Sequence, residues 1–325
     1  MGSRPDQPTL AAVVRERLGV SWKEARKLCR TGRATVGGER ETDPATRVDP
    51  AEVEVDPTAP KMRAGVLAPE ALLHVDAHVA VVAKEPGVLT VPYDRQDKDT
   101  LADQLRAQLR RQAKKRKGRR YDPEVGVVHR LDKGTSGLLV FTRTVAAKRH
   151  LQQQFRERSI HRRYVALTYG HASTGKHDSW LIANRGDGLR GSWGVFRAPT
   201  GKRPKDARRA ITHVLEARGM TAAGQPRSSL VTCRLETGRQ HQIRIHLAEA
   251  GHPLVGEHVY IRDYEGPRVD APRPMLHAIE LGFEHPATGA PMRFMLPPPE
   301  DFLATLRQLG GEPPTAWRAA KRRDA

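Results

Sequence analysis

Strand-like stretches dominate the sequence between residues 72 and 309, and they follow one another without regular βαβ alternation. Runs of apolar and β-branched residues lie at residues 79–83, 137–141, 164–169, 210–215 and 230–235. Two helices are expected among them, one capped by Thr144 and one ending at Gly251. This order predicts an α+β fold, in which a mixed, largely antiparallel sheet is flanked by helices.

Residues 9–57 are expected to form a separate small module. The apolar residues of its first helix share one face: Leu10, Val13, Val14 and Leu18. Gly19 ends this helix, and Ser21 caps a second one, with Glu24 at the position that a capping box requires. Short strands are expected at residues 33–36 and 53–55. The second helix carries a row of cations that could follow RNA phosphates: Lys23, Arg26, Lys27 and Arg30.

The charge of the chain favours a polyanionic partner. Lys and Arg number 56 against 37 Asp and Glu, which gives a net charge of +19. The most basic stretch, residues 106–120, includes Lys114 and Lys115 and contains no acid. It can be a flexible solvated loop, a phosphate-binding arm, or an arm that orders only on RNA.

Other classes of protein are disfavoured. No apolar run reaches the 18 residues that a membrane helix needs, and two cysteines are too few for a disulfide framework. We expect a soluble, cytoplasmic protein, with a monomer as the default.

The central motif is His129-Arg130-Leu131-Asp132-Lys133-Gly134-Thr135-Ser136-Gly137, just before an apolar strand. Taken alone, Asp132 would be an ordinary loop aspartate. Its two cationic neighbours, Arg130 and Lys133, would keep the carboxylate ionised, as a nucleophile or an ion-pair partner requires.

This motif resembles the active-site motif of the RluA-type pseudouridine synthases. Agreement continues in order through residues 73–87, 163–167 and 235–247, and the resemblance covers nearly all of residues 72–305. The N-terminal segment resembles the alpha-L RNA-binding module of some ribosomal proteins and RNA-modifying enzymes. The expected organisation is therefore an RNA-binding module at 9–57, a linker at 58–70, a catalytic domain at 71–309 and a basic tail at 310–325.

The resemblance implies that a uridine in RNA is isomerised to pseudouridine. This reaction needs no redox step and no external group, so neither a cofactor nor a metal is expected. Asp132 is the implied nucleophile, and either direct attack on the sugar or a glycal path remains open. Arg244 should pair with Asp132. Tyr164 should pack against the uracil and could take the proton from ring carbon 5, although an ordinary tyrosine is a poor base at neutral pH.

Two further arginines are candidates for contacts with RNA. Arg130 could enter the base stack or contact a phosphate, and Arg239 should contact the backbone. His241 and His246 are not expected to bind a metal together, because their five-residue offset does not place both on one helical face. Glu85 and Glu257 depart from the family pattern, and neither is expected to touch the three catalytic residues.

Two other functions compete with this interpretation. A non-catalytic RNA-binding factor would have lost Asp132, Tyr164 or Arg244, and all three are present. A glycosidase needs two acids, and no second acid is expected to act beside Asp132. Large-subunit ribosomal RNA is the favoured substrate and transfer RNA the alternative.

Overall fold

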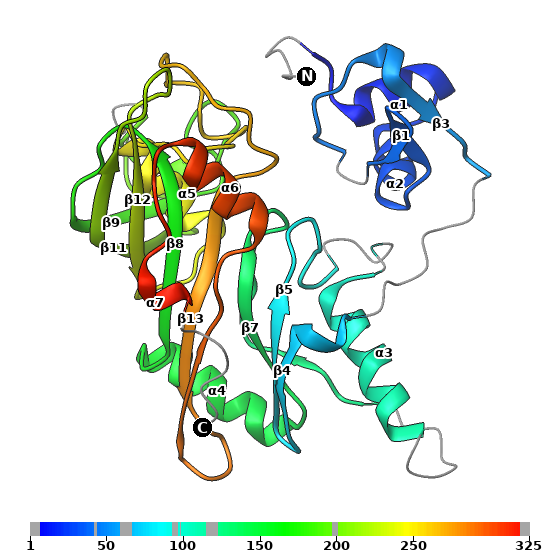
Figure 1. Ribbon diagram of the computed structural model, residues 1–325. Helices are drawn as coiled ribbons and strands as arrows, with labels where there is room; N and C mark the ends of the chain where they lie inside the picture. The colour runs from blue at the N-terminus through cyan, green and yellow to red at the C-terminus, as the bar shows by residue number, and fades with distance from the viewer. Residues whose placement is uncertain are drawn as a thin grey trace. The chain divides into compact units, whose positions relative to one another are not determined.

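The computed structural model describes residues 7–41, 44–58, 67–92, 97, 99–114, 123–196 and 201–318. The chain forms two compact units (Figure 1). One holds residues 1–67 and 91–121, and the other holds residues 68–90 and 122–325. The described residues 91–92, 97 and 99–114, which the sequence analysis placed in the catalytic domain, therefore group with the N-terminal module.

The N-terminal module has two helices and a small antiparallel sheet. Its elements are α1 (Leu10–Leu18), α2 (Trp22–Arg30), β1 (Ala34–Val36), β2 (Glu39–Arg40), the 3-10 helix η1 (Pro50–Glu52) and β3 (Val53–Val55), with sheet order β2-β1-β3. Gly19 ends α1 at φ +62°, and the Ser21 hydroxyl accepts a hydrogen bond from the Glu24 amide at 3.2 Å. The expected helices, caps and strands of this segment are confirmed.

A helix occupies much of the basic stretch. α3 (Leu101–Lys114) buries Leu101, Leu105 and Leu109, which recur every four residues along one face. The Thr100 hydroxyl accepts from the Asp103 amide at 3.3 Å and caps its first turn. Of the three alternatives left open for this stretch, the flexible loop does not hold as far as residue 114, and Lys115 lies outside the described residues.

The second unit is built on a mixed sheet of eleven strands. In chain order they are β4 (Leu72–Val75), β5 (Val79–Lys84), β6 (Gly126–Val127), β7 (Ser136–Thr142), β8 (His161–Tyr169), β9 (Gly175–Ile182), β10 (Gly191–Ser192), β11 (Arg208–Met220), β12 (Ser228–Leu235), β13 (Leu276–Glu284) and β14 (Pro291–Met295). The main path runs β10-β9-β11-β12-β8-β13-β7-β5-β4, with β14 on β13 and β6 on β7. Only the β7–β13 pair is parallel among the described strands, which confirms the mixed, largely antiparallel sheet.

Helices and apolar clusters cover this sheet. The 3-10 helix η2 (Pro69–Ala71) leads into β4, and the helices are α4 (Val145–Glu157), α5 (Gln242–Glu249), α6 (Glu300–Gln308) and α7 (Thr315–Arg318). α4 contributes Leu151 to the cluster around β5 and β7, while Phe302 of α6 packs on β8. Trp317 contacts Phe302 edge to face, so the expected tail is part of the packed body up to Trp317.

A close approach of two strands follows the central motif. Gly137 on β7 lies opposite Ala278 on β13 at φ +121°, a conformation that favours glycine. A Cβ atom here would lie 2.4 Å from the Ala278 carbonyl oxygen. Gly137 thus allows β13 to join β7 directly after the loop that carries Asp132.

Candidate active site

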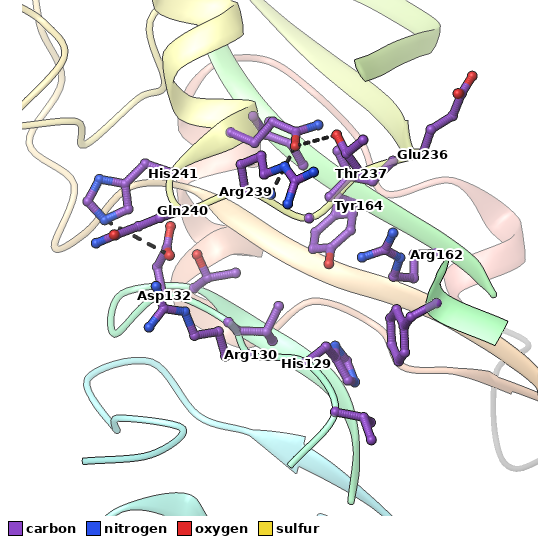
Figure 2. A pocket seen from close by; sticks show the side chains of 18 of the residues that line it. His129, Arg130, Asp132, Arg162, Tyr164, Glu236, Thr237, Arg239, Gln240 and His241 are labelled. Atoms are coloured by element: carbon purple, nitrogen blue, oxygen red, sulfur yellow. Dashed lines mark hydrogen bonds and ion pairs between the residues drawn. The ribbon is translucent and has the colours of Figure 1, made fainter. Parts of the chain in front are cut away.

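A cleft of about 660 Å³ opens beside the loop between β6 and β7. The loop forms one wall, β8 another, and the segment between β12 and α5 a third (Figure 2). Its charged lining residues are Arg130, Asp132, Arg156, Arg158, Arg162, Glu236 and Arg239. Cations outnumber acids in this lining, which favours an anionic ligand.

A buried lysine fixes the backbone of the Asp132 loop. Lys84 ends β5 and donates to the carbonyl oxygens of Glu85, Lys133 and Thr135 at 2.7–2.9 Å. Burial lowers the pKa of Lys84 to about 7, and the charge of Asp132 acts in the opposite direction. Thr90 adds a reciprocal pair of hydrogen bonds to the Leu131 backbone at 3.0 and 3.2 Å. The loop is therefore held on both sides of Asp132.

His129 supports the same loop from within the sheet. Its Nε2 accepts a hydrogen bond from the Val140 amide at 3.1 Å, beyond the point where β6 stops pairing with β7. Burial lowers the pKa of His129 to about 3, so the ring is neutral and its proton lies on Nδ1. The imidazole continues the hydrogen bonding of a strand that has ended.

Asp132 is part of a chain of charged groups. Its carboxylate is 22% exposed, and Arg244 Nη1 of α5 lies 3.8 Å from its Oδ2. The other edge of the Arg244 guanidinium donates two hydrogen bonds of 2.7 Å to Glu257. The buried Glu257 also accepts from the amides of His258 and Val259. Glu257 thus fixes the guanidinium that faces Asp132.

The charges of this pair reinforce each other. Burial acts to raise the pKa of Glu257, but the hydrogen bonds and the charge of Arg244 outweigh it and hold that pKa at about 2. Burial acts to lower the pKa of Arg244, and its hydrogen bonds with Glu257 raise it above the ordinary value. Both groups are ionised at neutral pH.

His241 and Tyr164 complete the surroundings of Asp132. His241 Nε2 lies 4.0 Å from Asp132 Oδ1, and its Nδ1 is 2.7 Å from the Tyr260 hydroxyl. Burial lowers the pKa of His241 to about 4, so this ring is neutral at pH 7. Tyr164 projects from β8 into the cleft, and burial raises its pKa (Figure 2). Its phenol therefore stays protonated at neutral pH, and even less of the ionised form is available to take a proton than in an ordinary tyrosine.

Comparison with known proteins identifies the chemistry of this cleft. Residues 78–249, which contain the loop, β8 and all of α5, match the model of the family described as RNA pseudouridylate synthase. The chain belongs to this family. It is an RNA pseudouridine synthase, an isomerase, as the sequence analysis concluded.

Relatives and solved structures agree with this assignment. The synthase is 35% identical to "Ribosomal large subunit pseudouridine synthase D" of Zymomonas mobilis over 74% of this chain and 73% of that protein. The protein of the same name from Nitrosomonas europaea is 32% identical, over 75% of this chain and 67% of its own. The structure titled "Human RNA Pseudouridylate Synthase Domain Containing 4" has a TM-score of 0.57 at 23% identity, covering 76% of this chain and 95% of that one. The last likeness concerns the fold alone.

The structure corrects two expectations about acids in the synthase. Glu257 was expected not to touch the catalytic residues, but it binds Arg244 directly, because α5 and the following turn bring the two together. Glu236 is a second carboxylate in the cleft, which the sequence analysis did not expect to act there. Its Oε2 lies 2.9 Å from Arg158 Nη1 and its Oε1 lies 2.6 Å from His213 Nε2, so both carboxylate oxygens already have partners.

The candidate RNA-binding residues fall into two groups. Arg130 is exposed at the cleft, and Arg239 lines it while donating through Nε to the Arg209 carbonyl at 3.0 Å. On α2 of the other unit, Lys23 and Arg26 are exposed, whereas Lys27 bonds to Glu24 at 2.9 Å and Arg30 lies 3.9 Å from Asp97. Lys114 ends α3, and nothing is described of its side chain.

His246, the histidine of α5, has partners within the protein. His246 contacts Thr212 Oγ1 at 2.8 Å and Ser179 Oγ at 2.9 Å. Within the described ranges no group of three or more potential ligands could hold a metal ion.

No helix among the described residues has the length and apolar character of a membrane span.

Sequence reasoning missed Lys84, Glu257 and Arg162 as members of the site. A lysine that ends an otherwise apolar strand was a usable signal for Lys84, because such a residue must find acceptors inside the protein. No local pattern marked Glu257 or Arg162.

Proposed function

We propose that the synthase isomerises uridines of large-subunit ribosomal RNA, with Asp132 as the nucleophile. The observation that carries the site assignment is the chain Asp132–Arg244–Glu257, in which a partly exposed carboxylate faces a buried, fixed guanidinium at 3.8 Å. These contacts leave the Asp132 carboxylate partly exposed to the cleft. A carboxylate in this position is ionised, oriented and accessible, as a nucleophile must be.

The reaction uses a carboxylate that is ionised, oriented and accessible. The bond between ribose carbon 1′ and ring nitrogen 1 breaks, and the electron pair leaves with the uracil. Asp132 either attacks the sugar or promotes cleavage through a glycal, and both routes require the ionised carboxylate. After the uracil turns, carbon 5 bonds to carbon 1′. On the first route this step breaks the bond between Asp132 and carbon 1′, and on the glycal route the carbon 2′ proton that Asp132 removed is returned. The proton of carbon 5 is then lost, and nitrogen 1 gains a proton.

Tyr164 is proposed to hold the uracil while it turns. Its ring lines the cleft from β8, a central strand that pairs with β12 and β13. Because burial raises the pKa of Tyr164, contact with the base is the better-supported role, and removal of the carbon 5 proton falls to another group or to water.

RNA affinity would come from two surfaces. Arg130 at the cleft is proposed to occupy the space that the extruded nucleotide leaves, since a guanidinium plane replaces lost base stacking. Arg239 would contact the backbone. The N-terminal unit is proposed to be an alpha-L RNA-binding module, on the basis of its paired helices, its small sheet and the exposed Lys23 and Arg26 of α2.

The choice of RNA rests on the names of the relatives, which act on the ribosomal large subunit by those names. Transfer RNA is the alternative substrate. We also propose that the synthase works as a monomer in the cytoplasm, where its ribosomal substrate would be met.

Release of tritium from carbon 5 of labelled uridine tests the proposal. Large-subunit ribosomal RNA and transfer RNA transcripts are compared with wild type, Asp132→Asn and Glu236→Gln. We expect release from ribosomal RNA by wild type and by Glu236→Gln, which removes the other carboxylate of the cleft. Asp132→Asn should abolish release and leave RNA binding intact.

Each alternative gives its own result. Release by Asp132→Asn at a substantial fraction of the wild-type rate would refute the nucleophile assignment. Faster release from transfer RNA would replace the proposed substrate. Equal losses in Asp132→Asn and Glu236→Gln would indicate chemistry with two acids.

A further inference from the structure

Arg162 is a charged residue of the cleft that the reaction described above does not use. It precedes Tyr164 by two positions on β8, and side chains two apart on a strand project from the same face. Figure 2 shows Arg162 beside Tyr164, facing the same space as His129 and Asp132. Arg162 is one of the residues that line the cleft.

The guanidinium of Arg162 is buried without an acidic partner. The residue is only 7% exposed, and its Nε has no hydrogen-bond partner. Its central carbon lies over the Phe155 ring, 5.2 Å from the ring centre, a cation–π contact that carries no negative charge. In the part of the chain that the structure describes, no carboxylate forms an ion pair with it, although buried cations are ordinarily paired.

The two carboxylates of the cleft are engaged elsewhere. Glu236 is bound by Arg158 and His213, and Asp132 faces Arg244. Neither is within ion-pair range of Arg162. An arginine keeps its charge at neutral pH even where burial lowers its pKa, as it does here, so an anion in the cleft would supply the missing counter-charge.

Resting on the proposed binding of RNA in this cleft, we propose that Arg162 is an anion subsite. It binds a phosphodiester group of the RNA next to the extruded uridine. Tyr164 then holds the base while Arg162, two residues away on the same strand, holds the backbone. Because both side chains project from one rigid strand, the distance between base and phosphate is fixed when the nucleotide enters.

A binding cycle with a neutral phosphate analogue tests this subsite. The probe is a fragment of large-subunit ribosomal RNA chosen by footprinting with the full chain. It is prepared with a single methylphosphonate at each position flanking the protected uridines. Dissociation constants are measured for wild type, Arg162→Met and Arg162→Lys. The control is Arg163→Met, the same change one residue along the strand, where the side chain lies 3.6 Å from Glu280.

We expect one methylphosphonate to weaken wild-type binding about tenfold, the size of a lost charge-assisted hydrogen bond. Arg162→Met should bind the natural RNA about tenfold more weakly and lose nothing further with that methylphosphonate. Arg163→Met should keep the wild-type sensitivity, and Arg162→Lys should keep part of it. If the losses from Arg162→Met and from every methylphosphonate simply multiply, or if Arg162→Met binds as wild type does, the subsite is refuted.

Thermal unfolding without RNA separates binding from a structural role. A buried cation without a partner does not stabilise the protein, so Arg162→Met should unfold at or above the wild-type temperature. A marked fall would mean that Arg162 serves the fold and would also refute the subsite. Tritium release is recorded on the same RNA. Its absence with wild type would count against the proposed substrate, while the dissociation constants would still decide the role of Arg162.

Discussion

Replacing Glu257 by Gln should destabilise the synthase and disable Arg244 together. The Glu257 side chain is fully buried and bonds to Arg244 at 2.7 Å through both oxygens. The change of its pKa from 4.5 to about 2 corresponds to about 3 kcal/mol of stability at neutral pH. Removing one partner of a buried ion pair costs about 3–5 kcal/mol in other proteins. The two estimates agree on a loss of about 3 kcal/mol in Glu257→Gln.

The sign of the pH dependence follows from the lowered pKa. The stabilisation by Glu257 is complete above pH 4.5 and is lost as the pH falls through about 2. The free energy of unfolding, measured with urea at several pH values, should therefore differ most between wild type and Glu257→Gln at neutral pH. The difference should shrink below pH 4.5. Glu216→Gln, an exposed site on β11, should change stability by less than about 0.5 kcal/mol.

Turnover gives the second readout of the same variant. Without the Glu257 carboxylate, the guanidinium of Arg244 is no longer held in place beside Asp132. We therefore expect the rate of tritium release to fall at least tenfold. Glu257→Asp keeps the charge and should retain more activity than Glu257→Gln. Unchanged stability of Glu257→Gln at pH 7, or a difference from wild type that is constant with pH, would refute the reasoning.

Three further changes test other parts of the structure. Gly137→Ala should destabilise the protein by about 3 kcal/mol in urea unfolding, because its Cβ would strike the Ala278 backbone; stability within 0.5 kcal/mol of wild type would contradict the close approach. Lys84→Met removes one donor from each of three carbonyl oxygens and should lower kcat of tritium release more than it raises KM; an unchanged kcat would mean that the loop holds its shape without Lys84. Lys23→Gln with Arg26→Gln should weaken RNA binding and reduce the slope of log affinity against log salt by about 1–2; an unchanged slope would place the RNA contacts elsewhere.

Local patterns predicted the elements that the chain forms from nearby residues. The strand after Asp132 and the helix capped by Thr144 are both present, since an apolar run and a cap are each sufficient signals. α3 was missed because its cations suggested a solvated loop, although Leu101, Leu105 and Leu109 recur at helical spacing. For this segment the spacing of the leucines predicts the helix correctly, whereas the density of charge does not.

Contacts between distant residues were outside the reach of pattern reasoning. The insertion of β13 between β7 and β8 depends on the whole sheet, and no local signal marks its partners. Glu257 differs from the usual family residue, which suggested a marginal position, yet the fold places it directly on Arg244. Arg162 stands out because its guanidinium is buried with no acidic partner among the described residues, and neither property can be read from the sequence.

The parallel junction of β7 and β13 also sets the order in which the synthase becomes competent during synthesis. Ser136, at the end of the Asp132 loop, is bound by His277, and the two are 141 residues apart. Arg273, just before β13, donates to the Gly134 carbonyl of the same loop. At about 5–20 residues per second this interval lasts on the order of ten seconds. Asp132 is thus translated well before the residues that support its loop, so that a nascent chain carries Asp132 through nearly half of its synthesis without a complete site.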